Sequence, residues 1–291
     1  MRPGLTPRGR RLEMDRVGLI GVGNVGSGFA EKLVEAGYPL TVLDRDRPRR
    51  DRAVALGARP AETPAEVAEA SGIIVLSLPG SAAVEEVMEG PAGLLSGLKA
   101  GQLVIDTGTT HPDTDIRYER LCRERGAGLI DAPITGRSKG WIIMVGGSAG
   151  DFERGREVLA RLGYKVKHIG PVGQGQVLKL MNQMVLAGQW AIWAETIAFG
   201  EKLGLDPRLL SEYLEFPIPE SLYGDEFSAG GQLALHYKDL GYALDLGHRS
   251  GASIPVTGLV HEVFKAAKTL GEPNWGQPGI VTYWRWLNGR R

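Results

Sequence analysis

The chain has 291 residues, 43% of them hydrophobic and 23% charged, which is the composition of a folded globular protein and excludes a disordered or fibrous chain. Lysine plus arginine and aspartate plus glutamate number 34 each, so no excess charge directs the protein toward nucleic acid or a membrane surface. The length favours two folding units, and a small molecule is the expected partner.

The first 15 residues are rich in arginine, proline and glycine, and we expect them to form a disordered tail. They lack the apolar run of a secretory signal, and no later run approaches the roughly 20 apolar residues that cross a bilayer. The single Cys122 has no partner for an internal disulfide, and no cysteine–histidine cluster has the spacing of a metal site. We therefore expect a cytoplasmic protein that binds neither a membrane nor a metal.

Residues 16–172 alternate short apolar runs with amphipathic stretches. This alternation predicts an α/β domain with a Rossmann-type, doubly wound parallel sheet flanked by helices. The expected strands cover residues 17–20, 40–43, 73–78, 103–105, 128–130, 142–145 and 165–169. The expected helices cover residues 25–36, 64–70, 82–89, 112–125 and 151–162.

Residues 21–26 read Gly-Val-Gly-Asn-Val-Gly and fit the pattern G-x-G-x-x-G, after an expected strand and at the start of an expected helix. In that context the first glycine permits a tight turn, the second lets a pyrophosphate approach the backbone, and the third lets helix and strand pack closely. The phosphates then lie at the positive end of the helix. An ordinary glycine turn is the alternative, which the flanking strand and helix disfavour. The dinucleotide-binding residues expected here are Gly21, Gly23, Asn24, Val25 and Gly26.

Asp44 ends the second expected strand, where a carboxylate accepts hydrogen bonds from the adenosine ribose hydroxyls of a dinucleotide. A carboxylate there repels the 2′-phosphate of NADP, which favours NAD as the cofactor. Arg45 and Arg47 stand next to it and offer a pairing site for that phosphate, so NADP stays the alternative. A solvated charge run is a third interpretation of residues 44–47.

A different pattern begins after residue 172. Residues 173–204 open with glycines and then continue without proline, which predicts a long interdomain helix whose regular part covers 177–203. No strand pattern follows it. Helices expected at 207–214, 233–249 and 257–270 make residues 205–291 an all-helical C-terminal domain.

One face of the long helix is polar at its start and aromatic further on. Lys179, Asn182, Gln183, Leu186, Trp190 and Trp193 fall on this face at helical spacings. On periodicity alone, an interdomain packing face with a lysine that reaches to water explains the pattern.

Six motifs in one order carry a resemblance to a known family. They are residues 21–26, 106–109 followed by Pro112, 131–136 (Asp-Ala-Pro-Ile-Thr-Gly), 144–147 (Met-Val-Gly-Gly), 173–183 and 238–245. From Arg16 onward the sequence resembles the β-hydroxyacid dehydrogenases, which include 3-hydroxyisobutyrate dehydrogenase, tartronate semialdehyde reductase and the glyoxylate and succinic semialdehyde reductases. The resemblance implies a nicotinamide-dependent homodimer or homotetramer that interconverts a small β-hydroxyacid, or a related anionic alcohol, and its aldehyde or ketone.

The resemblance also assigns roles to single residues. In the family, the lysine that matches Lys179 is the general acid/base, and the residues that match Thr135 and Gly136 hold the acid group of the substrate. An amide that matches Asn182 or Gln183 helps to orient the substrate, and the sequence leaves open which of them does so. The remaining matched residues lie near the nicotinamide or line the cofactor site, and they are Lys238, Leu78, Pro79 and Thr109.

The chain departs from the family pattern in the loop after residue 136. Arg137 replaces a glycine, and residues 138–141 run almost directly into the next strand, so the loop is shorter than in most relatives. Arg137 and Lys139 would add positive charge where an anionic group is expected, and we count Arg137 as a substrate-binding candidate. A neutral loop deletion is the alternative. The segment 216–224 is also unusual, and a simple helix-breaking connection explains it equally well.

Two other functions stay open at this point. An imine reductase or reductive aminase shares the implied architecture but generally carries another residue at the place of Lys179. A non-catalytic cofactor-binding protein is the second alternative. The presence of Lys179, Asn182 and Lys238 together favours the dehydrogenase.

Overall fold

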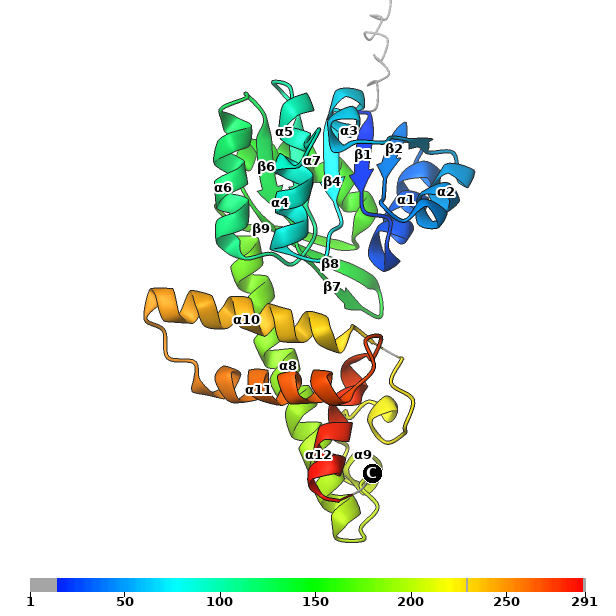
Figure 1. Cartoon of the computed structure of the whole chain (residues 1–291), viewed down its shortest axis with the longest axis vertical. Coiled ribbons are helices and arrows are strands. Elements are labelled where there is room, and N and C mark those ends of the chain that lie inside the picture. Colours follow the sequence, from blue (N-terminus) through cyan, green and yellow to red (C-terminus); the bar gives the residue numbers. More distant parts are fainter. Residues whose placement is uncertain (1–14, 229, 290–291) are drawn as a thin grey trace, which may run out of the picture. The chain divides into compact units, whose positions relative to one another are not determined.

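The structure is a computed structural model that describes residues 15–228 and 230–289. Of the tail expected over residues 1–15, residues 1–14 lie outside the described residues. The chain divides into two compact units (Figure 1). The sheet unit comprises the described residues up to Gly108 together with Pro112–Gly175, and the helical unit comprises Thr109–His111 and the described residues from Gln176 onward. No described helix is long and apolar enough to cross a membrane.

The strands of the sheet unit form one sheet in the order β3-β2-β1-β4-β5-β6-β8-β7, with β9 also paired to β8. The first six are parallel to one another, whereas β8 is antiparallel to β6 and β7 is antiparallel to β8. The strands are β1 Val17–Ile20, β2 Leu40–Leu43, β3 Arg59–Pro60, β4 Ile73–Leu76, β5 Leu103–Asp106, β6 Gly128–Asp131, β7 Ile134–Arg137, β8 Gly140–Gly146 and β9 Lys165–Gly170.

Helices cover both faces of this sheet. The helices of the sheet unit are α1 Asn24–Glu35, α2 Arg47–Ala55, α3 Pro64–Ala70, α4 Ser81–Glu89, α5 Leu94–Gly97, α6 Pro112–Arg123 and α7 Ala149–Leu162. Side chains alternate between the two faces, as a strand requires, so that Ile73 packs in the core beneath α1 and α7 while Ile74 packs beneath α3 to α6. Because both faces are buried, the central strands are apolar throughout.

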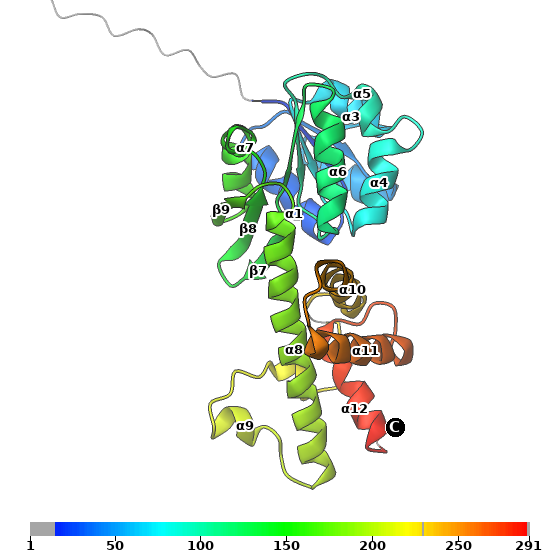
Figure 2. The same ribbon diagram turned by 90° about the vertical axis from the view of Figure 1, so that its left-hand side faces the viewer.

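The helical unit is built on α8, which runs from Gln174 to Lys202 as one helix. Figure 2 shows α10, α11 and α12 on one side of α8 and the short α9 on the other. The remaining elements are α9 Leu209–Glu212, α10 Leu233–Ser250, α11 Pro255–Leu270 and α12 Val281–Leu287, with 3-10 turns at Glu220–Leu222 and Gln277–Ile280. Small residues of α8 such as Ala187 and Ala194 are fully buried in the core of this unit, beside Phe264 of α11.

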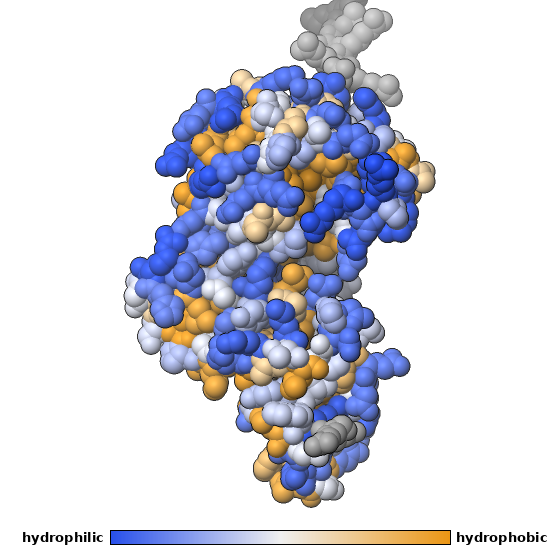
Figure 3. Space-filling view, in the orientation of Figure 1, coloured by the Kyte–Doolittle hydropathy of each residue, from blue (hydrophilic) through white to orange (hydrophobic). Residues whose placement is uncertain are grey.

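A stripe of side chains along α8 stays exposed. It consists of Met181, Val185, Ile192 and Phe199, and each of these side chains exposes more than half of its surface. The spacing of four or seven residues keeps them on one side of the helix. We call this set the α8 stripe. In Figure 3, apolar side chains interrupt the polar surface over the helical unit.

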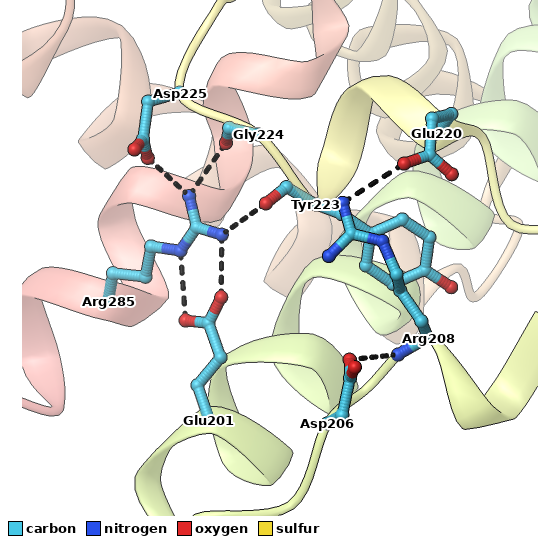
Figure 4. Close-up of polar contacts among 8 residues, drawn as sticks. All are labelled: Glu201, Asp206, Arg208, Glu220, Tyr223, Gly224, Asp225 and Arg285. Carbon is cyan, nitrogen blue, oxygen red and sulfur yellow. Dashed lines mark hydrogen bonds and ion pairs between the residues drawn. The ribbon is translucent and has the colours of Figure 1, made fainter.

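A buried arginine connects the last helix to the rest of the helical unit (Figure 4). Arg285 of α12 is 5% exposed and donates from Nε and Nη2 to the two carboxylate oxygens of Glu201, at 2.9 and 2.6 Å. Its Nη1 donates to the carbonyl of Gly224 at 2.9 Å and to Asp225 at 3.0 Å, and Nη2 reaches the carbonyl of Tyr223 at 3.4 Å. Guanidinium and carboxylate geometry match in this bidentate pair, so α12 is held against α8 and the loop at 223–225.

The expected fold class is confirmed, with a Rossmann-type sheet followed by a long helix and a helical part. The sequence predictions missed β3, β7, α2, α5 and α12. The two strands contain proline, glycine or arginine, and their backbones are ordered by pairing with neighbours rather than by an apolar pattern. The sheet also turns antiparallel at β8, since a short hairpin and not a helix connects β7 to β8.

Candidate active site

The glycine loop lies between β1 and α1, and its glycines are required by close backbone approach. Gly21 has φ +93°, and a Cβ there would overlap the carbonyl oxygen of Ser77. A Cβ on Gly26 would overlap the carbonyl oxygen of Gly21. Gly23, the residue before α1, has no such contact beyond one side chain, which leaves its backbone accessible. A loop of this kind at a helix N-terminus fits the pyrophosphate of a dinucleotide.

Asp44 follows β2 and is hydrogen-bonded to the glycine loop. Its Oδ2 accepts from the backbone N–H of Val22 at 2.7 Å, and its Oδ1 accepts from the N–H of Asp46 at 2.8 Å. The carboxylate is thereby fixed beside the loop, where its remaining lone pairs suit ribose hydroxyls. Arg45 is exposed next to it. A different arginine, Arg49 of α2, lies at the loop, because its Nη1 is 3.5 Å from the Cβ position of Gly23.

The segment after β4 forms the other wall of the loop. The carbonyl of Ser77 lies against Gly21, and the Cδ2 atom of Leu78 is 3.3 Å from the Cβ position of Gly21. The Leu78 carbonyl in turn lies 2.6 Å from the Cβ position of Gly108, which follows β5. Pro79 is exposed at the end of this segment. The structure therefore brings the glycine loop, Asp44 and Leu78 together, and these residues fit a dinucleotide cofactor.

Thr135 and Gly136 lie on β7, in a hairpin with β8. Thr135 is buried and pairs with Ile142, while Gly136 pairs with Trp141, whose ring atom Cζ3 lies 2.9 Å from the Cβ position of Gly136. Only residues 138 and 139 form the turn, so the shortened loop is a two-residue hairpin. The backbone of Arg137 ends β7, but its side chain lies outside what the structure describes.

Lys179 lies on α8, and only 7% of its surface is exposed. Its Nζ donates a hydrogen bond at 3.0 Å to Oε1 of Gln183, one turn later on the same face. The same oxygen accepts from Nδ2 of Asn182 at 3.1 Å, and Nε2 of Gln183 donates to Oδ2 of Asp239 at 2.6 Å. Because Asp239 binds the NH₂ end of the amide, the oxygen end faces Lys179.

Lys238 of α10 extends this group toward the loop Thr109–His111. Its Nζ lies 3.2 Å from Oδ1 of Asp239, donates to the carbonyl of Thr109 at 2.7 Å, and stands 5.2 Å from the ring centroid of Tyr242. The pKa of the Asp239 carboxyl is raised above its ordinary value because it is buried. The charges of Lys238 and Lys179 and the hydrogen bond from Gln183 each lower this pKa but do not cancel the effect of burial. Two cations and an amide thus surround one buried carboxylate.

His236 lies on α10, one turn before Asp239. It is 3% exposed, and burial, with a smaller effect from the charge of Lys179, lowers its pKa to about 4. The amide of Gln277 donates to its Nε2 at 2.8 Å, and its ring packs against Phe264 with centroids 5.5 Å apart. At neutral pH this histidine is uncharged and adds no positive charge beside Lys179.

Comparison with known proteins places this chemistry in a family. A family model described as the NAD binding domain of 6-phosphogluconate dehydrogenase matches residues 16–170, and one described as the NAD-binding part of NADP-dependent 3-hydroxyisobutyrate dehydrogenase matches residues 173–284. The 2-(hydroxymethyl)glutarate dehydrogenase of Eubacterium barkeri is 30% identical over 289 residues, covering 94% of this chain and 96% of that protein. The chain belongs to the β-hydroxyacid dehydrogenase family.

Two further relatives agree with this membership. The mitochondrial 3-hydroxyisobutyrate dehydrogenase of Mus musculus is 33% identical over 290 residues, covering 92% of this chain and 87% of that one. The solved 3-hydroxyisobutyrate dehydrogenase of Mycobacterium tuberculosis with L-serine has a TM-score of 0.83 at 25% identity, over 94% of this chain and 99% of that chain. This β-hydroxyacid dehydrogenase is therefore an oxidoreductase that uses NAD or NADP.

Several candidates from the sequence come together within the units of this β-hydroxyacid dehydrogenase. Lys179, Asn182 and Gln183 form one hydrogen-bonded group, and Lys238 contacts Thr109. The interpretation of the lysine side chain as one that reaches to water is wrong, since Lys179 is buried. No group of three or more His, Cys, Asp and Glu side chains within residues 15–228 and 230–289 is arranged to hold a metal ion.

Sequence reasoning missed three residues of this region. Asp239 belongs to the 238–245 motif, which gave it no role of its own, although a carboxylate next to a lysine on a buried helix face signals an ion pair. The sequence pointed to Arg45 and Arg47 instead of Arg49, because no helical pattern marks α2. Ser77 lies after an expected strand, but its backbone contact with Gly21 has no signature in the sequence.

Proposed function

We propose that the enzyme interconverts a small β-hydroxyacid, or a related anionic alcohol, and its aldehyde or ketone, with Lys179 as the general acid/base. The observation that carries the proposal is the buried ammonium of Lys179, held by Gln183 and, through it, by Asp239. The names of two relatives support the substrate class, because 2-(hydroxymethyl)glutarate and 3-hydroxyisobutyrate both carry a hydroxymethyl group on the carbon next to a carboxylate.

The proposed chemistry needs one proton-transferring group. When bound, the nicotinamide cofactor supplies or accepts the hydride. In reduction, the substrate oxygen gains negative charge and Lys179 donates a proton to it; in oxidation, Lys179 takes the hydroxyl proton. Gln183 accepts one N–H of Lys179 and so fixes the direction of the others, while Asp239 prevents the amide from rotating. A fixed donor lowers the cost of reaching the reactive geometry.

We assign the acid group of the substrate to Thr135 and Gly136, with Arg137 and Asn182 as further contacts. The hydroxyl of Thr135 and the backbone of Gly136 are neutral donors of the kind that bind carboxylates, and the hairpin keeps them on a paired strand. The Oε1 atom of Gln183 accepts hydrogen bonds from both Lys179 and Asn182, which supports Gln183 as the residue that holds Lys179 and Asn182 as the amide that meets the substrate.

NAD is the proposed cofactor in preference to NADP. The carboxylate of Asp44 stands at the glycine loop and repels a 2′-phosphate, while Arg49 and Arg45 supply partial compensation. We expect a higher kcat/KM with NADH than with NADPH. Substitution of Arg49 by alanine should reduce activity with NADPH more than with NADH, because only NADPH carries the phosphate. An equal effect on both would exclude a role in phosphate binding.

A homodimer or homotetramer is the proposed assembly, and we place it in the cytoplasm, where NAD(P) is available. The α8 stripe supports self-association, because water-exposed apolar side chains at helical spacing gain free energy when a second copy covers them. Replacement of Ile192 by glutamate should shift the molar mass measured by light scattering toward the monomer. The same replacement at Thr269, an exposed polar position of α11, should leave the mass unchanged.

The central test combines a substrate panel with a lysine variant. Purified enzyme with NADH or NADPH is offered small aldehyde acids, a sulfonated aldehyde and cyclic imines, and the nicotinamide absorbance is followed. Lys179→Ala should retain cofactor binding and lose turnover of the aldehyde acids roughly 10²- to 10⁴-fold. Lys202→Ala, at the far end of the same helix, is the matched control. Near-normal turnover in the Lys179 variant refutes the mechanism, and turnover of imines alone assigns the enzyme to imine reduction.

A further inference from the structure

Asp131, at the end of β6, is a buried carboxylate that has no part in the proposed chemistry. It is fully buried, and its Oδ1 accepts a hydrogen bond from the backbone N–H of Gly173 at 2.6 Å. A charge in such a place persists only when hydrogen bonds compensate the loss of water. Its partner Gly173 directly precedes α8, so the carboxylate lies at the positive end of that helix.

Glycines enclose this carboxylate. A Cβ on Gly175, in the first turn of α8, would overlap the carbonyl oxygen of Met144 and come within 2.6 Å of Oδ2 of Asp131. A Cβ on Gly146, at the end of β8, would overlap Oδ1 of Asp131. The first turn of α8 therefore contacts the ends of β6 and β8 through backbone and carboxylate atoms, with no flexible side chain between them. Such a contact fixes the start of the helix closely.

Gly175 and Lys179 are four residues apart on α8. They lie on the same face, one turn apart, or about 6 Å along the axis. Because α8 is continuous from Gln174 to Lys202, a shift of its first turn moves Lys179 as well. We infer that Asp131 is a positioning residue that, with Gly175, sets the place of Lys179 through the first turn of α8. The inference rests on the proposed role of Lys179 as the general acid/base.

The first test measures turnover of 3-hydroxyisobutyrate and 2-(hydroxymethyl)glutarate at a temperature well below that of unfolding. The rate is expressed per cofactor-binding site. Asp131→Ala and Gly175→Ala should each lower kcat roughly 10- to 100-fold, the loss that a displacement of about 1 Å produces, while the Kd for NADH stays unchanged. Asp131→Asn keeps an oxygen for Gly173 and should recover most of kcat. Gly150→Ala, in the first turn of α7, is the matched control, since a Cβ there meets no atom closer than Ser148 Oγ, at 4.0 Å.

Reductive methylation of Lys179, followed by mass spectrometry, provides a second test that needs no substrate. The buried amine should react several-fold faster in Asp131→Ala and Gly175→Ala than in the parent enzyme or in Gly150→Ala. Lys32, in the sheet unit, is bonded to the carbonyl of Leu162 and serves as the internal control.

The outcomes separate the inference from the proposed function. Normal turnover in Lys179→Ala means that the proposed function fails. If Lys179→Ala is inactive but Asp131→Ala and Gly175→Ala keep full kcat and the parent rate of methylation, the inference alone is overturned. It is also overturned if the Asn variant is as impaired as the Ala variant, because the lost hydrogen bond to Gly173 then has no part in the effect.

Discussion

Removal of the Arg285 guanidinium should destabilise the helical unit strongly. Arg285→Met keeps the apolar stem but leaves the Glu201 carboxylate, whose side chain is 19% exposed, without its bidentate partner. Breaking one side of a buried ion pair costs roughly 3–5 kcal/mol. The carbonyls of Tyr223 and Gly224 lose their donors too, at about 1 kcal/mol each when left unsatisfied. Water that reaches Glu201 offsets part of this, so we expect a loss of about 4 kcal/mol in the free energy of unfolding.

Urea unfolding followed by tryptophan fluorescence measures this loss, and most of the signal comes from the helical unit. Of the six tryptophans, one is in the sheet unit and five are in the helical unit: Trp190, Trp193, Trp275, Trp284 and Trp286. Asp225→Asn is the control, because the Asp225 side chain is 76% exposed and its pair with Arg285 should contribute less than about 1 kcal/mol. The double variant Arg285→Met, Glu201→Leu removes both buried charges and should recover part of the loss.

Two results would refute this reasoning. One is a loss below about 1 kcal/mol for Arg285→Met, which would mean that hydration of Glu201 compensates for the lost ion pair. The other is an Asp225→Asn variant as unstable as Arg285→Met, which would assign the stabilisation to the exposed carboxylate.

Three further predictions follow from the glycine loop and from buried titratable groups. Gly26→Ala should abolish NADH binding in a fluorescence titration, because its Cβ would overlap the Gly21 carbonyl, whereas Gly28→Ala, with no atom within 4 Å, should bind NADH normally. His236 should stay neutral in the native enzyme down to about pH 4, while it takes up a proton near pH 6.5 in the unfolded chain. The stability of the parent relative to His236→Gln should therefore fall by roughly 3 kcal/mol between pH 7 and pH 4, and a pH-independent difference would contradict the burial argument. Cys122, whose pKa burial raises to about 12, should react with a thiol reagent only after unfolding; rapid reaction of the native enzyme would show that the thiol is accessible.

The sequence was sufficient for the features that depend on local patterns. The expected strands at 17–20 and 40–43 match β1 and β2, because short β-rich apolar runs between turn residues identify buried strands. The contact between Lys179 and Gln183 follows from their spacing of four residues on a helix. The roles of these residues, and those of Thr135, Gly136 and Arg137, stay predictions.

Features that depend on distant pairing were beyond the sequence. Gln183 meets Asp239 across 56 residues, and only the packing of α8 against α10 brings the amide to the carboxylate. The strand β7 is ordered by its hairpin with β8, while its own residues include a glycine and a polar threonine. Helix α2 is mostly charged, so no apolar period marks it; its N-cap Asp46, which accepts from Arg49, is the local signal that it did carry.

The loop Thr109–His111 limits how the chain can be divided into fragments. It leaves the sheet unit after Gly108 and returns at Pro112, yet its partners Lys238, Gln176 and Asp245 all belong to the helical unit. A helical fragment that begins at Gln176 would lack the loop and would leave Lys238, Gln176 and Asp245 without these contacts. A chimaera between two relatives therefore needs to take both stretches of chain, the loop Thr109–His111 and the part from Gln176 onward, from the same parent.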